Sequence, residues 1–127
     1  MGVVVRDAEA AADTYQRALG LEAVALEEFR GTARVAFLRM GETLLELIQP
    51  LSDDTPWASA LRQQGEGAHH VALEVADLRG AMRAVVASGV GLLDARPDRA
   101  PGNTLSVFLD PATTGGILIE LVQQIQV

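Results

Sequence analysis

The stretch Val75-Ala76-Asp77-Leu78-Arg79-Gly80-Ala81 decides the fold, because it repeats the pattern of Val5-Arg6-Asp7-Ala8-Glu9-Ala10-Ala11. In both stretches an apolar run meets an aspartate and an alanine-rich segment, and matching residues lie 70 positions apart. The match continues with Phe37-Leu38 against Phe108-Leu109 at an offset of 71, and with Leu45-Glu46-Leu47 against Ile119-Glu120-Leu121 at an offset of 74. Such self-similarity indicates two copies of one structural module.

Each copy is predicted to fold as a strand, a helix and three further strands, in the order βαβββ. Asp7 and Asp77 are typical N-cap residues, and Gly20 and Gly89 follow the helical stretches, where a glycine commonly ends a helix. Apolar and alternating runs predict the strands. We expect strands at 1–6, 21–29, 32–40 and 42–49 with a helix at 8–19, then strands at 69–75, 90–96, 104–109 and 116–123 with a helix at 78–88.

The composition limits the class of protein. With 127 residues the chain has the size of one domain, and we expect a single α+β domain over 1–127: module one at about 1–50, a linker at about 51–67 with a short helix near 57–61, and module two at about 68–127. The sequence has no signal-peptide pattern and no membrane-spanning run of about 18 apolar residues. These features predict a cytoplasmic protein that does not act at a membrane.

The chain contains no cysteine, and all ten basic residues are arginine. Disulfides, thiolate ligands and Schiff-base lysines are therefore excluded, so any metal must be held by histidine and carboxylates. The formal net charge of −7 would repel a phosphate backbone, and the arginines are scattered. We therefore expect no nucleic-acid partner.

Strand alternation predicts which polar side chains share a face. His70 and Glu74 should point to one side of their strand, away from the side that the following helix covers. By the same alternation Glu46 and Glu120 should avoid the helix-packed face of their strands. They occupy equivalent positions of the two modules, inside apolar runs where an unpaired carboxylate would be costly to bury. A metal ion or a solvent-filled cavity would remove that cost.

These residues resemble the vicinal oxygen chelate (glyoxalase/bleomycin resistance/dioxygenase) superfamily, and within it the methylmalonyl-CoA epimerases. The resemblance covers essentially the whole chain. Its more specific motifs are Gly65-Glu66-Gly67-Ala68-His69-His70 and Gly115-Gly116-Ile117-Leu118-Ile119-Glu120-Leu121. It implies that the two βαβββ modules form a curved, mostly antiparallel sheet around a metal cavity, and that the protein pairs as a homodimer.

The resemblance also implies the site. A divalent ion (Co, Mn, Zn, Ni or Mg) is expected on His70, Glu120 and Glu46, while His69 is expected to support a ligand from behind or to play a structural role. The partner of His70 in module one would fall directly before Met1, and we expect that the native chain supplies a histidine there. Several epimerases carry an acidic residue in the third strand, at the position of Val35 here, so the assignment of the base is weaker than that of the metal ligands.

The implied reaction is the metal-dependent epimerisation of methylmalonyl-CoA, an acyl-CoA thioester, by α-proton abstraction through a metal-stabilised enolate. Glu120 is the first candidate for the base and Glu46 the second. Arg99 and Arg39 are candidates for holding the substrate carboxylate or the CoA phosphates, and the alternative, which is the more common role of an arginine, is that each is a solvated surface residue.

Three other functions fit the same fold. One is a glyoxalase I-like lactoylglutathione lyase, one is a non-catalytic antibiotic or small-molecule binding protein of the bleomycin-resistance type, and one is a member with a decayed site. Ring-cleaving dioxygenases of this superfamily commonly need four modules, so the length of the chain opposes that reading.

Overall fold

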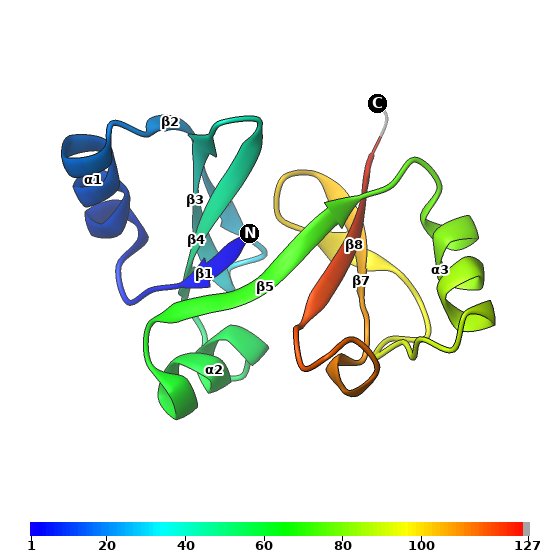
Figure 1. The fold of residues 1–127 in the computed structure, drawn as a ribbon. Coiled ribbons are helices and arrows are strands. Elements are labelled where there is room, and N and C mark those ends of the chain that lie inside the picture. The colour runs from blue at the N-terminus through cyan, green and yellow to red at the C-terminus, as the bar shows by residue number, and fades with distance from the viewer. Residues whose placement is uncertain (126–127) are drawn as a thin grey trace. The chain divides into compact units, whose positions relative to one another are not determined.

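The structure is a computed structural model that describes residues 1–125 (Figure 1). Its contacts divide the chain into two compact units, Met1–His69 (unit 1) and His70–Val127 (unit 2). Each unit holds one βαβββ module, so the predicted α+β class and the two tandem modules are confirmed. The organisation of the whole chain as one domain stays a prediction.

Unit 1 contains a four-stranded sheet with strand order β2-β3-β4-β1. The pairs β2–β3 and β3–β4 are antiparallel, and β1–β4 is parallel. Its elements are β1 (Gly2–Val4), α1 (Ala8–Leu19), β2 (Glu22–Phe29), β3 (Ala33–Met40), β4 (Thr43–Pro50) and α2 (Pro56–Gln64).

Unit 2 repeats this arrangement with strand order β5-β8-β7-β6, in which β5–β8 is parallel and the other pairs are antiparallel. The strand β5 begins before the boundary between the units. The elements are β5 (Gly67–Glu74), α3 (Leu78–Ala87), β6 (Asp98–Ala100), β7 (Thr104–Phe108), the 3-10 helix η1 (Pro111–Thr113) and β8 (Ile119–Gln124).

The two main helices begin in the same way. The Asp7 carboxylate accepts the N–H of Ala10, and the Asp77 carboxylate accepts the N–H of Gly80, each at 3.1 Å. Both aspartates are thus the N-caps that the sequence predicts. Gly20 ends α1 with φ of +69°, a left-handed conformation that glycine adopts without strain.

A second hydrogen bond joins the first turn of each helix to the last strand of its own βαβββ module. The side-chain oxygen of Gln49 accepts the N–H of Ala8 at 3.0 Å, and that of Gln123 accepts the N–H of Leu78 at 2.7 Å. The first N–H groups of a helix have no partner within the helix, so these bonds satisfy donors that packing would otherwise leave without one. The repeated pair supports the internal symmetry of the chain in atomic detail.

The apolar core of each unit lies between its main helix and one face of its sheet. In unit 1, α1 packs on Ala36 and Leu38 of β3 and on Leu45 and Leu47 of β4. The other face carries a smaller cluster, in which Trp57 of α2 packs against the residues Ala33, Val35, Phe37 and Ile48. The segment predicted as a linker thus provides the helix that covers part of this second face.

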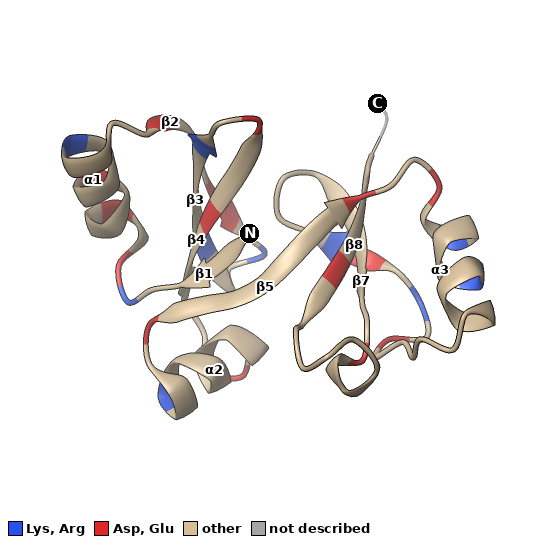
Figure 2. Ribbon diagram, in the orientation of Figure 1, with Lys and Arg blue, Asp and Glu red and all other residues tan. Residues whose placement is uncertain are grey.

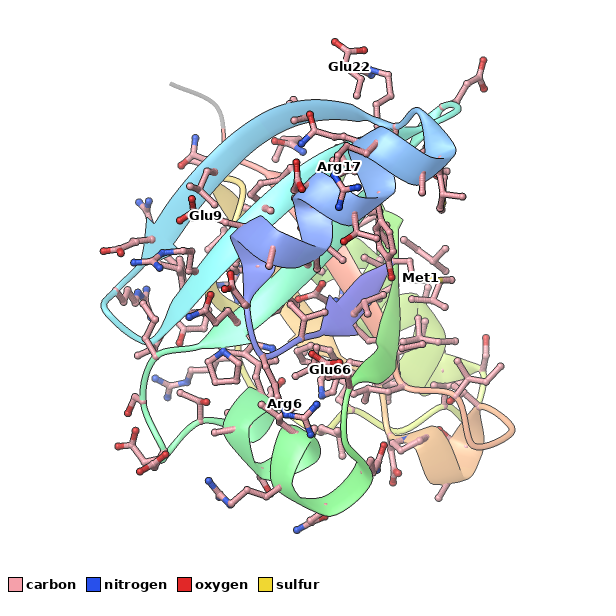
Figure 3. All side chains as sticks on the ribbon, turned by 90° about the vertical axis from the view of Figure 1, so that its left-hand side faces the viewer. Met1, Arg6, Glu9, Arg17, Glu22 and Glu66 are labelled. Atoms are coloured by element: carbon pink, nitrogen blue, oxygen red, sulfur yellow. The ribbon has the colours of Figure 1, made fainter. Side chains whose placement is uncertain are left out.

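Figure 3 shows how the end of β1 is tied to the turn between α2 and β5, where Arg6 and Glu66 point toward one another. The Glu66 carboxylate accepts the backbone N–H of Arg6 at 2.8 Å and lies 3.4 Å from its guanidinium. Both side chains are well exposed, so the ion pair itself adds little to the stability.

The prediction of a strand at 90–96 is wrong. Only one bridge forms there, between Leu92 and Leu109, and the strand that pairs with β7 lies at Asp98–Ala100. The reason is local: the N–H of Phe108 donates to the Asp94 side chain at 3.2 Å, while its carbonyl accepts the N–H of Leu93 at 2.9 Å. The Asp94 side chain therefore accepts the N–H of Phe108 that a backbone carbonyl of a paired strand would otherwise accept, and the segment 90–96 does not pair regularly with β7.

None of the helices among residues 1–125 is both long enough and apolar enough to cross a membrane.

Candidate functional site

The site begins with a buried pair in unit 2. Nε2 of His70, on β5, lies 3.3 Å from Oε1 of Glu120, on β8. Only 5% of His70 and 7% of Glu120 is exposed. A carboxylate so far removed from water requires a polar partner, and an imidazole edge at this distance provides one.

Strand register explains why these two side chains meet. The parallel pair β5–β8 sets Ala72 opposite Glu120, so His70 lies two residues away on the same face. Ile119 and Leu121, the neighbours of Glu120, point into the core beneath α3. The predicted common face of His70 and Glu120, away from the helix, is therefore confirmed.

The aromatic ring of Phe108 holds the imidazole from the side. The ring centroids of His70 and Phe108 are 5.4 Å apart with an interplanar angle of 89°, which is an edge-to-face contact. Phe108 is also the cross-strand partner of Glu120 on β7. One apolar side chain thus touches the histidine and adjoins the carboxylate, which limits the movement of both.

The predicted third ligand, Glu46, lies in unit 1 on β4. It is half-buried, and register places it opposite Phe37 of β3 and Gly2 of β1. Its neighbours Leu45 and Leu47 are buried under α1, so Glu46 faces away from that helix as predicted. Acidic residues therefore occur on strands of both units (Figure 2).

The hydrogen bond at Met1, just before β1, has an equivalent at Val71, within β5. The amino group of Met1 donates to the carbonyl of Leu44 at 3.0 Å, as the N–H of Val71 donates to that of Leu118 at 3.1 Å. The counterpart of His70 in unit 1 is therefore the position directly before Met1, in agreement with the offset of 70 in the sequence.

His69 precedes His70 on β5, but its side chain lies elsewhere. It lines a cavity of about 70 Å³ in unit 1, together with Val4 of β1 and residues 64–68 at the end of α2. Its expected role, structural or in support of a ligand, stays a prediction.

The two arginines suggested for the substrate are placed differently. Arg39 lies 3.5 Å from the Glu22 carboxylate in an exposed ion pair. Arg99 is exposed on β6, and register sets it opposite Leu105, which packs toward the core of α3. Arg99 therefore points to the helix side of the sheet, away from the face of His70 and Glu120.

The donors of the pair suit a divalent ion. Imidazole nitrogen and carboxylate oxygen are ligands for Zn, Co, Mn and Ni, and two donors bound to one ion at about 2.1 Å lie about 3.0 to 3.4 Å apart. The distance of 3.3 Å between His70 and Glu120 is within that range. Among residues 1–125, however, no three such side chains come together as a metal-binding group. The structure therefore brings together two of the three predicted ligands.

Comparisons with known proteins show the family of the chain. The family model described as Glyoxalase/Bleomycin resistance protein/Dioxygenase superfamily matches residues 1–108. Human mitochondrial methylmalonyl-CoA epimerase is 33% identical over 127 residues, which cover 97% of this chain and 71% of the human protein.

Solved structures give the same result. The methylmalonyl-CoA epimerase of Mycobacterium tuberculosis matches with a TM-score of 0.89 at 30% identity, over 98% of this chain and 85% of that one. The Streptomyces coelicolor methylmalonyl-CoA epimerase, in complex with 2-nitronate-propionyl-CoA, matches with a TM-score of 0.90 at 28% identity, over 98% and 94%. The resemblance predicted from the sequence is confirmed. The chain belongs to the glyoxalase/bleomycin resistance protein/dioxygenase superfamily, in which these relatives and structural neighbours are epimerases, enzymes of the isomerase type.

Proposed function

We propose that this protein is a metal-dependent epimerase of methylmalonyl-CoA. The observation that carries the proposal is the buried His70–Glu120 pair at 3.3 Å, in a chain whose relatives and structural neighbours include methylmalonyl-CoA epimerases. The complex of the Streptomyces enzyme with an acyl-CoA analogue supports a CoA thioester as the ligand here. The cytoplasmic location and the homodimer that the sequence predicts stay predictions.

His70, Glu120 and Glu46 would hold the divalent ion, and Co, Mn, Zn, Ni and Mg all suit this set of nitrogen and oxygen donors. When bound, such an ion stabilises negative charge on the carbonyl oxygens of the substrate. The chain contributes rigidity: Phe108 restricts the imidazole of His70, and the β5–β8 ladder fixes its spacing from Glu120.

Epimerisation requires removal and return of one proton at the carbon between the thioester and the carboxylate. A carboxylate takes the proton from this carbon, the electron pair of the C–H bond moves onto the thioester oxygen, and a proton returns to the opposite face. Glu120 is the first candidate for this transfer because it is buried beside His70, and Glu46 is the second.

The test combines metal analysis with an assay of each epimer of methylmalonyl-CoA. The wild-type chain should bind a divalent ion and interconvert the epimers, whereas His70→Ala should lose both the bound metal and the turnover. His69→Ala is the matched control, because its side chain lines the cavity at the end of α2 and does not belong to the His70–Glu120 pair, and it should keep both. If the wild type binds metal but converts neither epimer, the proposal is wrong.

The same preparations separate the rival functions. A glyoxalase I-like lyase would instead isomerise the hemithioacetal of glutathione and methylglyoxal. A binding protein of the bleomycin-resistance type would bind its ligand and convert neither methylmalonyl-CoA nor the hemithioacetal.

A further inference from the structure

A cavity of about 470 Å³ lies beside α3 in unit 2. Its walls come from α3 and from the segment before β6, and the residues that line it are Arg79, Met82, Arg83, Val86, Ala87 and Leu92. Sites for small molecules typically have volumes of roughly 300 to 1,000 Å³. Met82 and Leu92 also pack in the core beneath α3, whereas His70 and Glu120 lie on the opposite face of the sheet. The cavity is therefore separate from the candidate active site.

The irregular segment 90–96 forms one side of this cavity. In unit 1 the strand that follows the helix, β2, has eight residues and pairs with β3. In unit 2 the equivalent segment makes one bridge, from Leu92 to Leu109, before β6 begins at Asp98. A regular strand does not lie beside α3 here, and Leu92 forms the wall of the cavity opposite the helix.

One face of α3 combines cations with apolar side chains. Arg79 and Arg83 are four residues apart, as are Met82 and Val86, so all four lie on the same face of the helix. The basic residues of α3 are blue in Figure 2. Among residues 1–125, neither guanidinium group forms a salt bridge with a carboxylate. Like charges one turn apart repel each other, and an anion bound between them would remove this repulsion.

The corresponding face of α1 carries the opposite charge. By the offset of 70, Arg79 corresponds to Glu9 and Arg83 to Asp13. The Asp13 carboxylate is paired within its own helix, 2.8 Å from the guanidinium of Arg17. The two modules thus share one fold, but the charges on the outer face of the helix are reversed and, in α3, are not neutralised by a neighbouring side chain.

Val86 adds apolar surface at a position where α1 has a polar residue. It is 55% exposed, and its counterpart by the same offset is Gln16. Covering this surface with an apolar group would be favourable. The net charge of −7 opposes an acidic protein or an anionic membrane, since either would bring many negative charges close to the chain. A small molecule with one anionic group and an apolar part fits these features best.

We propose that this cavity binds a small amphipathic anion, an unbranched alkyl chain that ends in a carboxylate. The carboxylate accepts hydrogen bonds from the guanidinium groups of Arg79 and Arg83, whose planar shape matches it. The alkyl chain lies against the apolar wall that Val86 and Leu92 provide. The inference does not depend on the proposed function, because the cavity and the candidate active site lie on opposite sides of the sheet of unit 2.

The test uses octanoate as the probe. Acetate keeps only the carboxylate of this probe, and 1-octanol keeps only its chain. Titration calorimetry gives the affinities, and NMR shifts of the Val86 and Leu92 methyl groups give the place of binding. We expect octanoate to bind at least about 10-fold more tightly than either compound, as the loss of one charge-assisted hydrogen bond predicts. Added salt should weaken its binding.

Two variants give the cavity residues the identity of their counterparts in α1. The double change Arg79→Glu with Arg83→Asp should abolish the binding of octanoate, and Val86→Gln should weaken it. All three positions are exposed, so the fold should persist, which circular dichroism and the melting curve check. Arg17→Gln, on α1, is the matched control and should bind octanoate like the wild type.

Several results would overturn the inference. These are no binding of octanoate to the wild type, binding without shifts at Val86 and Leu92, equal affinity for 1-octanol, or unchanged affinity in the double variant. If Val86→Gln alters the oligomeric state in sedimentation but not the affinity for octanoate, this face is an interface between copies of the chain and the inference is wrong. The epimerase assay is independent of all these readings, so failure here leaves the proposed function intact.

Discussion

The side-chain oxygen of Gln123 accepts the backbone N–H of Leu78 at 2.7 Å, which joins the last strand of unit 2 to the first turn of its helix. Replacing Gln123 with alanine leaves this N–H without its partner in a half-buried place. We expect Gln123→Ala to lower the free energy of unfolding by about 1 to 2 kcal/mol. Urea denaturation measures this, and Gln124→Ala, at an exposed neighbour, should change it by less than about 0.5 kcal/mol. Equal effects of the two changes would show that the bond does not contribute.

Leu38 tests the core under α1. It is completely buried, so Leu38→Ala should cost about 2 to 5 kcal/mol of unfolding free energy through lost burial and the cavity left behind. Leu26→Ala is the control on the adjacent strand, because Leu26 is 54% exposed, and it should cost far less. Thermal and urea melts of the two variants give the comparison, and similar losses would contradict the packing described for unit 1.

Glu120→Gln tests the buried pair with almost no change in shape. The amide can still contact His70, so the fold should persist, but the carboxylate charge and its capacity to accept a proton are lost. We expect turnover to be abolished and the bound metal to fall. Elemental analysis and the epimerase assay provide the two readings, and full activity of the variant would refute the role given to Glu120.

The position before Met1 can be filled experimentally. The hydrogen bonds of Met1 and Val71 show that a histidine placed there would be the counterpart of His70. Adding it should tighten the binding of a divalent ion and raise the melting temperature in the presence of that ion. An alanine at the same position is the control. Identical metal affinity of the two chains would remove this position from the ligand set.

Local chemistry made much of the site predictable from the sequence. The capping aspartates Asp7 and Asp77 mark where the helices begin, and residue alternation on a strand fixes the faces of His70 and Glu120. These features depend on neighbours within a few residues along the chain. Because the two modules have similar sequences, the helix start and the strand faces inferred in one module also apply to the other.

Two findings required the structure because they depend on pairing between strands. The bond of the Asp94 side chain to the N–H of Phe108, which interrupts the expected strand at 90–96, joins residues 14 positions apart. The common face of Glu27 and Glu46 follows from the registers of two strand pairs, and a shift of one residue would reverse it.

The glutamine anchors have a consequence for how this fold tolerates insertions. The offset between the modules grows from 71 at Phe37 and Phe108 to 74 at Gln49 and Gln123, so the connection after β7 is three residues longer than the one after β3, and it contains η1. Yet both glutamines bind the first turn of their helices in the same way. The glutamine contact therefore holds the last strand of each module to the start of its helix whatever the length of the connection before that strand, so a loop of different length leaves the strand that carries Glu120 in place.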